Sequence, residues 1–274
     1  MFSRSPSSMT ERFEEMFAAA RAENRAALLP YRTSGLPDPS SSLDLFKAMA
    51  GAGADGFEVG IPYSDPLMDG PTIHEAGLRA LRAGATIDSS MTLVEQIVAS
   101  TGKPVVVMTY VNPVLAIGPE AFASRVAQAG GSGLIIADLP ADESESIANA
   151  CAAAGIGLVL FVAPTTDEAR LAQVVSRDPL FVYGVAELGV TGKRTAASAH
   201  AAALSQRVRS ATSAPLVLGV GISTPEAAHE AAGVADGVIV GSALVRRVLD
   251  AESSAAACDS LATAVAALAA AVRR

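Results

Sequence analysis

Three carboxylates lie within or just after an apolar stretch, FEVGIPYSDPLMDGPTI (57–73). Glu58 stands inside a short apolar run that is typical of a buried strand, and Asp65 and Asp69 follow in a loop rich in proline and glycine. A buried carboxylate without a partner is costly, and desolvation raises its pKa toward neutrality. Such a group can both donate and accept a proton, so Glu58 is a candidate catalytic acid and base.

Each of these acids also has a structural interpretation. Glu58 could be satisfied by a buried structural partner, and an aspartate in a turn readily hydrogen-bonds its own backbone. For Asp65 the turn interpretation and the functional one stay equally open. Asp69 directly precedes Gly70-Pro71, where the loop can fold back over the end of the strand, and this position favours a functional role.

The elements that must position these acids alternate along the chain. Short apolar runs predict eight strands, at 27–32, 56–60, 104–110, 133–138, 157–163, 180–186, 215–221 and 236–241. Helical patterns follow at 42–52, 72–82, 89–101, 119–129, 142–154, 166–176, 198–211, 224–233, 242–249 and 256–272, and another precedes the first strand at 10–24. Strict alternation of this kind requires parallel strands with right-handed crossovers. We therefore predict a single (β/α)8 TIM barrel over 10–274 with an extra N-terminal helix, and the alternative is a doubly wound open sheet.

A barrel places its active site at the carboxyl ends of its strands. Glu58 would point into the interior there, because side chains on a strand alternate between the two faces. Barrels frequently bind phosphate in the loops after strands seven and eight, where backbone N–H groups of glycine-rich turns act as donors. GVGIS (219–223) and VGSAL (240–244) occupy those loops, so Gly221, Gly241 and Ser242 are predicted phosphate donors, with turn formation alone as the other interpretation.

The loop after the sixth strand, VAELGVTGKRTAAS (185–198), is long and contains Gly189, Thr191 and Gly192. Its length and composition predict a lid that closes over a bound phosphoester. Tyr183 on the preceding strand could stack or hydrogen-bond inside the barrel, although a lone aromatic residue is more often part of the core.

Composition excludes several classes of protein. The chain has 274 residues and a net charge of −8, which disfavours nucleic acid as a partner. Cys151 and Cys258 form no paired motif, and no histidines have the spacing of metal ligands. The apolar run 255–272 predicts a terminal helix docked on the barrel, not a membrane span. Residues 1–9 are expected to be a disordered tail without a signal peptide, so a cytoplasmic location is expected.

Several motifs of the chain resemble those of one known family. FEVGIPYSDPLMDGPTI is similar to the LELGIPFSDPxADGPTIQ signature of tryptophan synthase α subunits. The similarity continues in ERFEEMF, TYVNPV, ADLP, YGVAELGVTG, GVGIS and VGSALV, so it covers nearly the whole chain from Met9 onward.

The resemblance implies retro-aldol cleavage of indole-3-glycerol phosphate to indole and glyceraldehyde 3-phosphate, as part of L-tryptophan biosynthesis. It implies that Glu58 protonates indole C3 and takes a proton from the glycerol hydroxyl, and that Asp69 accepts or polarises the indole N–H. It implies no cofactor or metal on this chain, because pyridoxal phosphate (PLP) belongs to a partner β subunit of an α2β2 complex.

Other residues match the family less closely. Tyr31 and Tyr183 match residues of the substrate pocket, and Gly192, Gly221, Gly241 and Ser242 match phosphate contacts. Asp65 matches an aspartate that faces the β subunit.

The chain also departs from the family pattern. Departures occur at Arg32, His74, Ala186-Glu187 and Val220, and they concern lid behaviour, pocket fit and partner coupling. Two alternative functions stay open, a standalone indole-3-glycerol phosphate lyase that releases free indole and a non-catalytic barrel that binds phosphoesters.

Overall fold

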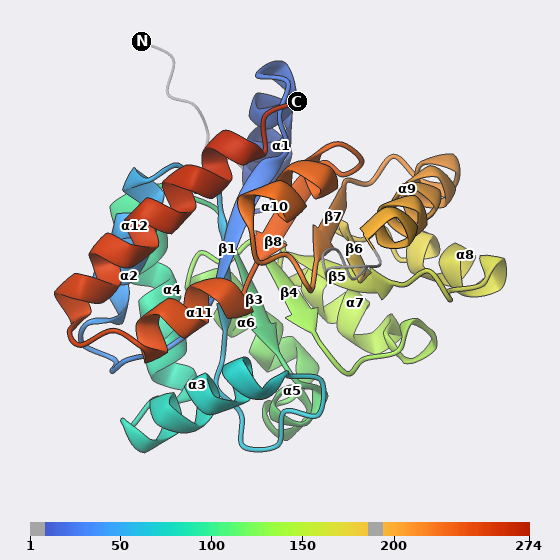
Figure 1. The fold of residues 1–274 in the computed structure, drawn as a ribbon. Coiled ribbons are helices and arrows are strands. Elements are labelled where there is room, and N and C mark those ends of the chain that lie inside the picture. Colours follow the sequence, from blue (N-terminus) through green and yellow to red (C-terminus); the bar gives the residue numbers. More distant parts are fainter. Residues whose placement is uncertain (1–8, 186–193) are drawn as a thin grey trace, which may run out of the picture.

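The computed structural model of the chain describes residues 9–274 except 186–193, and only the backbone is described for 194–198. The expected N-terminal tail therefore lies almost entirely outside the described residues. The fold is a closed barrel in which the strands follow one another in chain order and every neighbouring pair is parallel (Figure 1). The predicted (β/α)8 barrel is confirmed.

The strands agree with the sequence prediction to within two residues at each end. They are β1 (Ala27–Thr33), β2 (Phe57–Gly60), β3 (Val105–Thr109), β4 (Gly133–Ile136), β5 (Gly157–Val162), β6 (Val182–Val185), β7 (Leu216–Gly219) and β8 (Gly237–Val240). Nearly all of their residues are buried, because the interior side chains fill the barrel and the outer ones pack against helices.

The helices form the outer layer, as expected for this fold (Figure 1). They are α1 (Glu11–Ala22), α2 (Ser42–Gly51), α3 (Pro71–Arg82), α4 (Ile87–Thr101), α5 (Val111–Ile117), α6 (Pro119–Gln128), α7 (Glu145–Ala153), α8 (Glu168–Ser176), α9 (Arg194–Ala211), α10 (Pro225–Ala232), α11 (Ser242–Leu249) and α12 (Ser254–Ala271), with a 3-10 turn η1 (Ala141–Glu143). The sequence analysis missed α5. Pro113 lies in its first turn, where proline is tolerated because the missing N–H has no partner within the helix.

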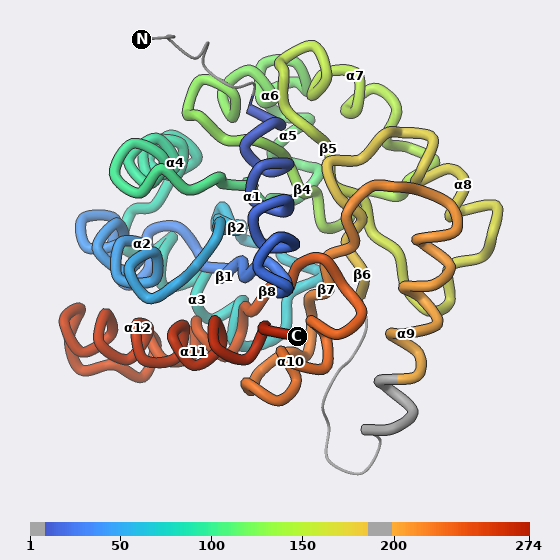
Figure 2. Tube along the Cα trace, turned by 90° about the horizontal axis from the view of Figure 1, so that it is seen from above, coloured from blue at the N-terminus to red at the C-terminus, as the bar shows by residue number. Residues whose placement is uncertain are grey.

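Helix α1 closes the amino-terminal end of the barrel (Figure 2). Its buried face carries Phe13, Met16 and Phe17. Phe13 stacks on Phe181 with ring centroids 5.9 Å apart, and Phe17 lies so close to Gly237 that a side chain there would touch its ring. The opposite end, where the strands finish, is therefore the open mouth.

Helix α12 is the terminal helix that the sequence analysis expected to dock on the barrel. It is long and apolar enough to cross a membrane by length and composition alone. In the structure it packs along α2 and also contacts α10 and α11. Its buried residues include Leu261, Val265 and Leu268, which lie on the side that faces the barrel. The docked arrangement is confirmed.

Two segments of matching sequence hold the amino-terminal ends of strands in place. ADGFEVG (54–60) ends with β2, and ADGVIVG (235–241) contains β8. Asp55 donates its N–H to the Leu28 carbonyl and accepts the Leu28 N–H on its carboxylate at 2.8 Å. Asp236 makes the same two bonds with Leu216 on β7.

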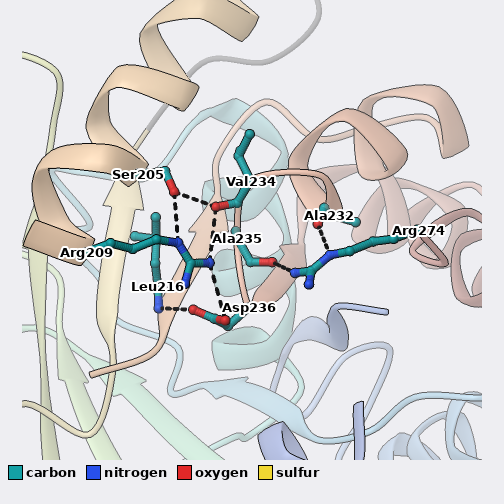
Figure 3. A network of polar contacts seen from close by, with 8 residues as sticks. All are labelled: Ser205, Arg209, Leu216, Ala232, Val234, Ala235, Asp236 and Arg274. Carbon is teal, nitrogen blue, oxygen red and sulfur yellow. Dashed lines mark hydrogen bonds and ion pairs between the residues drawn. The ribbon is translucent and has the colours of Figure 1, made fainter. Parts of the chain in front are cut away.

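An arginine completes each of these carboxylate sites. Arg25 forms a two-pronged pair with Asp55 at 2.6 and 2.8 Å. Arg209 reaches Asp236 at 3.3 Å, while the C-terminal Arg274 donates to the Ala232 and Ala235 carbonyls beside it (Figure 3). Both matching segments thus stabilise the end of the barrel that lies away from the mouth.

We expect Asp55→Ala to lower the free energy of unfolding by about 2–4 kcal/mol, because it leaves Arg25 and the Leu28 N–H without their acceptor. Urea unfolding at pH 7 measures this loss. The control is Asp44→Ala, which removes an exposed carboxylate paired with Lys47 at 3.6 Å and should cost less than about 1 kcal/mol. Equal effects of the two substitutions would contradict the assignment of Asp55 as a strand anchor.

Candidate active site

Glu58 is the buried carboxyl group of the barrel mouth. It lies on β2 in register with Tyr31 on β1 and Val106 on β3, and its side chain is 4% exposed. Its Oε2 atom has no hydrogen-bond partner among the described residues. Burial raises the pKa of Glu58 to about 8, and the charge of Asp69 adds to the effect. The alternative of a neutralising structural partner therefore finds no support in the described part of the chain.

Two tyrosines share the interior with Glu58. Tyr31 and Tyr183 are buried, and the pKa of Tyr183 is raised by burial first and then by the nearby charge of Glu58. Each hydroxyl approaches a glycine on another strand. A Cβ atom at Gly60 would lie 2.3 Å from the Tyr31 hydroxyl, and one at Gly219 would lie 2.0 Å from the Tyr183 hydroxyl. These two positions accept only glycine if the tyrosines keep their places.

Asp69 lies at the end of the β2–α3 loop and is partly buried. Its backbone N–H donates to the Pro66 carbonyl at 3.1 Å, which folds the loop back toward the mouth. Burial raises the pKa of Asp69, and the hydroxyl of Tyr110 partly offsets this shift. The Tyr110 hydroxyl is close enough to influence the carboxylate but has no hydrogen bond of normal geometry with any described residue.

Tyr110 is a site residue that the sequence analysis did not single out. It is buried at the carboxyl end of β3 and stacks on Tyr63 with ring centroids 5.3 Å apart. The Tyr63 hydroxyl accepts a hydrogen bond from Asn112 Nδ2 at 3.1 Å. The motif TYVNPV contains both Tyr110 and Asn112, so its position after a predicted strand was the available signal.

Asp65 lies apart from the buried group. It is exposed, accepts a hydrogen bond from the Ser64 hydroxyl at 2.5 Å, and its carbonyl accepts the Leu67 N–H at 3.0 Å. The turn interpretation thus describes its local contacts. The side chains that follow are unusual for a loop surface, because Leu67 is 86% exposed and Met68 is 65% exposed.

The two predicted phosphate turns both lie at the mouth end of their strands. Gly221 follows β7 with φ of +76°, and Val220 before it has φ of +70°, a value that a β-branched residue rarely adopts. Gly241 precedes α11 and lies against the Tyr31 ring, and Ser242 is the first residue of that helix. Among the described residues, the amides of Gly221 and Ser242 donate no hydrogen bond.

The remaining predictions concern the lid and metals. Gly192 and the stretch Ala186-Glu187, with most of the expected lid at 185–198, lie outside the described residues. Among the residues that the structure does describe, no group of three histidine, cysteine or acidic side chains is placed to hold a metal ion.

Comparisons with known proteins agree with this arrangement. The family model described as tryptophan synthase alpha chain matches residues 17–273. The tryptophan synthase alpha chain of Streptomyces coelicolor is 43% identical over 259 residues, which cover 94% of this chain and 96% of that protein. The one from Chloroflexus aggregans is 46% identical over 238 residues, covering 86% and 89%.

Solved structures give the same result. Mycobacterium tuberculosis tryptophan synthase superposes with a TM-score of 0.86 at 40% identity, covering 96% of this chain and 98% of that one. Tryptophan synthase subunit alpha from Legionella pneumophila superposes with a TM-score of 0.86 at 30% identity, covering 95% and 98%.

The raised pKa of Glu58 predicts a pH dependence of stability. The unfolded chain loses this proton near pH 4.5 and the folded chain only near pH 8, so burial of Glu58 costs least below pH 4.5 and progressively more as pH rises between these values. Wild type should therefore lose stability relative to Glu58→Gln by up to about 1.4 kcal/mol per pH unit. Urea unfolding of both proteins at pH 5, 6, 7 and 8 measures the difference.

The matched control is Glu145→Gln, which changes an exposed glutamate on α7. Its stability should follow that of wild type across the same range. A constant gap between Glu58→Gln and wild type from pH 5 to 8 would show that Glu58 titrates normally in the folded chain.

Proposed function

The chain belongs to the tryptophan synthase alpha chain family, and from that premise we propose that Glu58 and Asp69 carry out its lyase reaction. The reaction cleaves indole-3-glycerol phosphate to indole and glyceraldehyde 3-phosphate in tryptophan biosynthesis. One observation carries the proposal. Glu58 is buried, unpaired at Oε2 and shifted to a pKa of about 8, with a second carboxylate close enough to affect it.

The pKa of Glu58 suits it to act first as an acid. At pH 7 a group with a pKa of about 8 is mostly protonated, so it can deliver a proton to indole C3. Protonation converts the ring into a cation, into which the electron pair of the C–C bond can move as the bond breaks. The Glu58 carboxylate left behind then takes the proton of the glycerol hydroxyl as that carbon becomes an aldehyde. The proton count of the enzyme is thus restored.

Asp69 has a different role because its surroundings differ. It is only partly buried, and the Tyr110 hydroxyl favours its charged form. A carboxylate at this position stabilises the positive charge that develops at the indole N–H when C3 is protonated. Two carboxyl groups whose environments separate their pKa values commonly divide the acid and electrostatic roles in this way.

The surrounding residues fit the two halves of the substrate. Tyr31 and Tyr183 line the interior where the indole would lie, and the glycines that face them, Gly60 and Gly219, make room for the two tyrosine hydroxyls. We assign the phosphate to the turns at Gly221 and Gly241-Ser242, because the Gly221 and Ser242 amides donate no hydrogen bond among the described residues and the N-terminus of α11 favours an anion. Gly192, matched to the same role by its motif, belongs to this proposal as an expectation.

The partner is the β subunit of tryptophan synthase, which carries the pyridoxal phosphate, and this chain has no cofactor of its own. We place Asp65 in the surface that meets that subunit. Leu67 and Met68 beside it are exposed apolar side chains, and Leu115 on α5 is 58% exposed. Apolar side chains grouped at the mouth are typical of a protein interface. No observation favours a standalone lyase. We propose a cytoplasmic location for this biosynthetic enzyme.

We expect Glu58→Gln to lower lyase turnover by roughly 10²–10⁴-fold, because an amide cannot shuttle the proton. Steady-state release of indole by the purified chain, alone and with a β subunit, measures the effect. The control Glu95→Gln alters an exposed glutamate on α4 and should retain turnover. A folded Glu58→Gln protein with near-normal turnover would remove Glu58 from the reaction.

Asp69→Asn should lower kcat much more than it raises KM, because the carboxylate acts on charge that exists mainly in the transition state. The same assay at varied substrate concentration separates the two constants. Asp142→Asn in the exposed η1 turn serves as the control. A change in KM with kcat preserved would identify Asp69 as a ground-state contact or a residue that shapes the loop.

A further inference from the structure

Arg32 is a buried arginine on the side of β1 that faces the helices. It follows Tyr31, which points into the barrel, so its own side chain points outward toward α2. The residue is 0% exposed. Its Nη2 donates to the Leu36 carbonyl at 2.8 Å, and its Cζ lies 6.0 Å from the centre of the Phe46 ring on α2.

The charge of Arg32 lacks a counter-charge. Among the described residues, Nε and Nη1 have no hydrogen-bond partner, and no carboxylate forms an ion pair with the guanidinium. Burial lowers the pKa of Arg32 to about 10, so the group still carries its charge at pH 7. One carbonyl and one ring face do not offset the desolvation of a buried cation, which costs several kcal/mol.

A second unsatisfied donor lies on the same face of α2. Ser42 and Phe46 are one helical turn apart, both are fully buried, and side chains at this spacing are neighbours on a helix. The Ser42 hydroxyl has no hydrogen-bond partner among the described residues. Ser42 is also the first residue of α2, where backbone N–H groups give the helix end a partial positive charge.

The nearby groups do not supply the missing negative charge. Cys258 on α12 is the first titratable neighbour to act on Arg32, but burial and then Asp44 raise its pKa, so the thiol stays neutral. Asp44 points to solvent and pairs with Lys47 at 3.6 Å. Asp38 accepts both the N–H and the hydroxyl of Ser41, which precedes α2, so its carboxylate is held by these donors and forms no ion pair with Arg32 among the described residues.

We propose that Arg32, Ser42 and the first turn of α2 bind a small monovalent anion, for which chloride is the cellular candidate. Arg32 and Ser42 supply hydrogen-bond donors, and the guanidinium and the start of α2 supply positive charge. Both side chains are fully buried, which favours a compact ion of single charge over phosphate, whose second charge and four oxygens would need more donors. The site lies on the outer side of β1 and is independent of the proposed reaction at the mouth.

The first test measures the thermal midpoint of the full-length chain in sodium chloride and in sodium gluconate at the same ionic strength. Chloride should raise the midpoint by roughly 2–3 °C for each tenfold increase above its dissociation constant, and gluconate should not. Arg32→Met should abolish the difference between the salts. Arg125→Met, which removes an exposed arginine on α6, should preserve it.

Two further measurements keep the test decisive if Arg32→Met folds poorly. Ser42→Ala retains the charge but removes one donor, so it should shift the chloride response to several-fold higher concentration. Crystals grown in bromide should show an anomalous peak within hydrogen-bond distance of Arg32 Nε or Nη1. Identical responses to chloride and gluconate, or an ordered water in place of bromide, would overturn the proposal.

Discussion

The Glu58 carboxyl is buried inside a closed barrel, and its Oε2 atom has no partner among the described residues. Parallel strands β1 and β3 flank it on both sides. This desolvation raises its pKa, and the nearby Asp69 charge reinforces the shift. A cationic neighbour would stabilise the carboxylate and remove its ability to donate near pH 7. The residues packed against Glu58 must therefore fill space without carrying a positive charge, and Tyr31 and Tyr183 meet both requirements.

The aromatic residues in turn constrain the strands beside them. Gly60 and Gly219 admit the two tyrosine hydroxyls at distances that any Cβ atom would block, and Gly241 contacts the Tyr31 ring. Gly241 also belongs to the turn to which we assign the phosphate. The same small residue thus limits the proposed indole pocket on one side and shapes the proposed phosphate turn on the other. Changes at Gly241 would therefore affect both halves of the substrate.

Much of this architecture could be predicted from the sequence, because continuous apolar runs and period-two alternation identify strands and place Glu58 on an inner face. The tyrosine–glycine contacts could not be predicted from the sequence, because they depend on which strands are neighbours and on the register between them. The contact between Tyr110 and Asp69 joins two loops, which periodicity does not describe. Arg32 was visible as a departure from the family pattern, but its missing partners depend on the packing of α2. The match between ADGFEVG and ADGVIVG is present in the sequence, but the bonds of Asp55 and Asp236 depend on which strands are neighbours.

That match contrasts a stabilising carboxylate with the proposed catalytic one within a single short segment. Asp55 and Glu58 are three residues apart, or about 10 Å along an extended chain. Asp55 has an arginine and a backbone N–H as partners, whereas Glu58 forms no ion pair with any residue that the structure describes. The second copy keeps the paired aspartate as Asp236 but has the apolar Ile239 at the position of Glu58. The paired carboxylate is thus common to both copies and holds the strand ends, while Glu58 is added at the mouth end of β2, where its cost in stability fits the proton transfer that we propose.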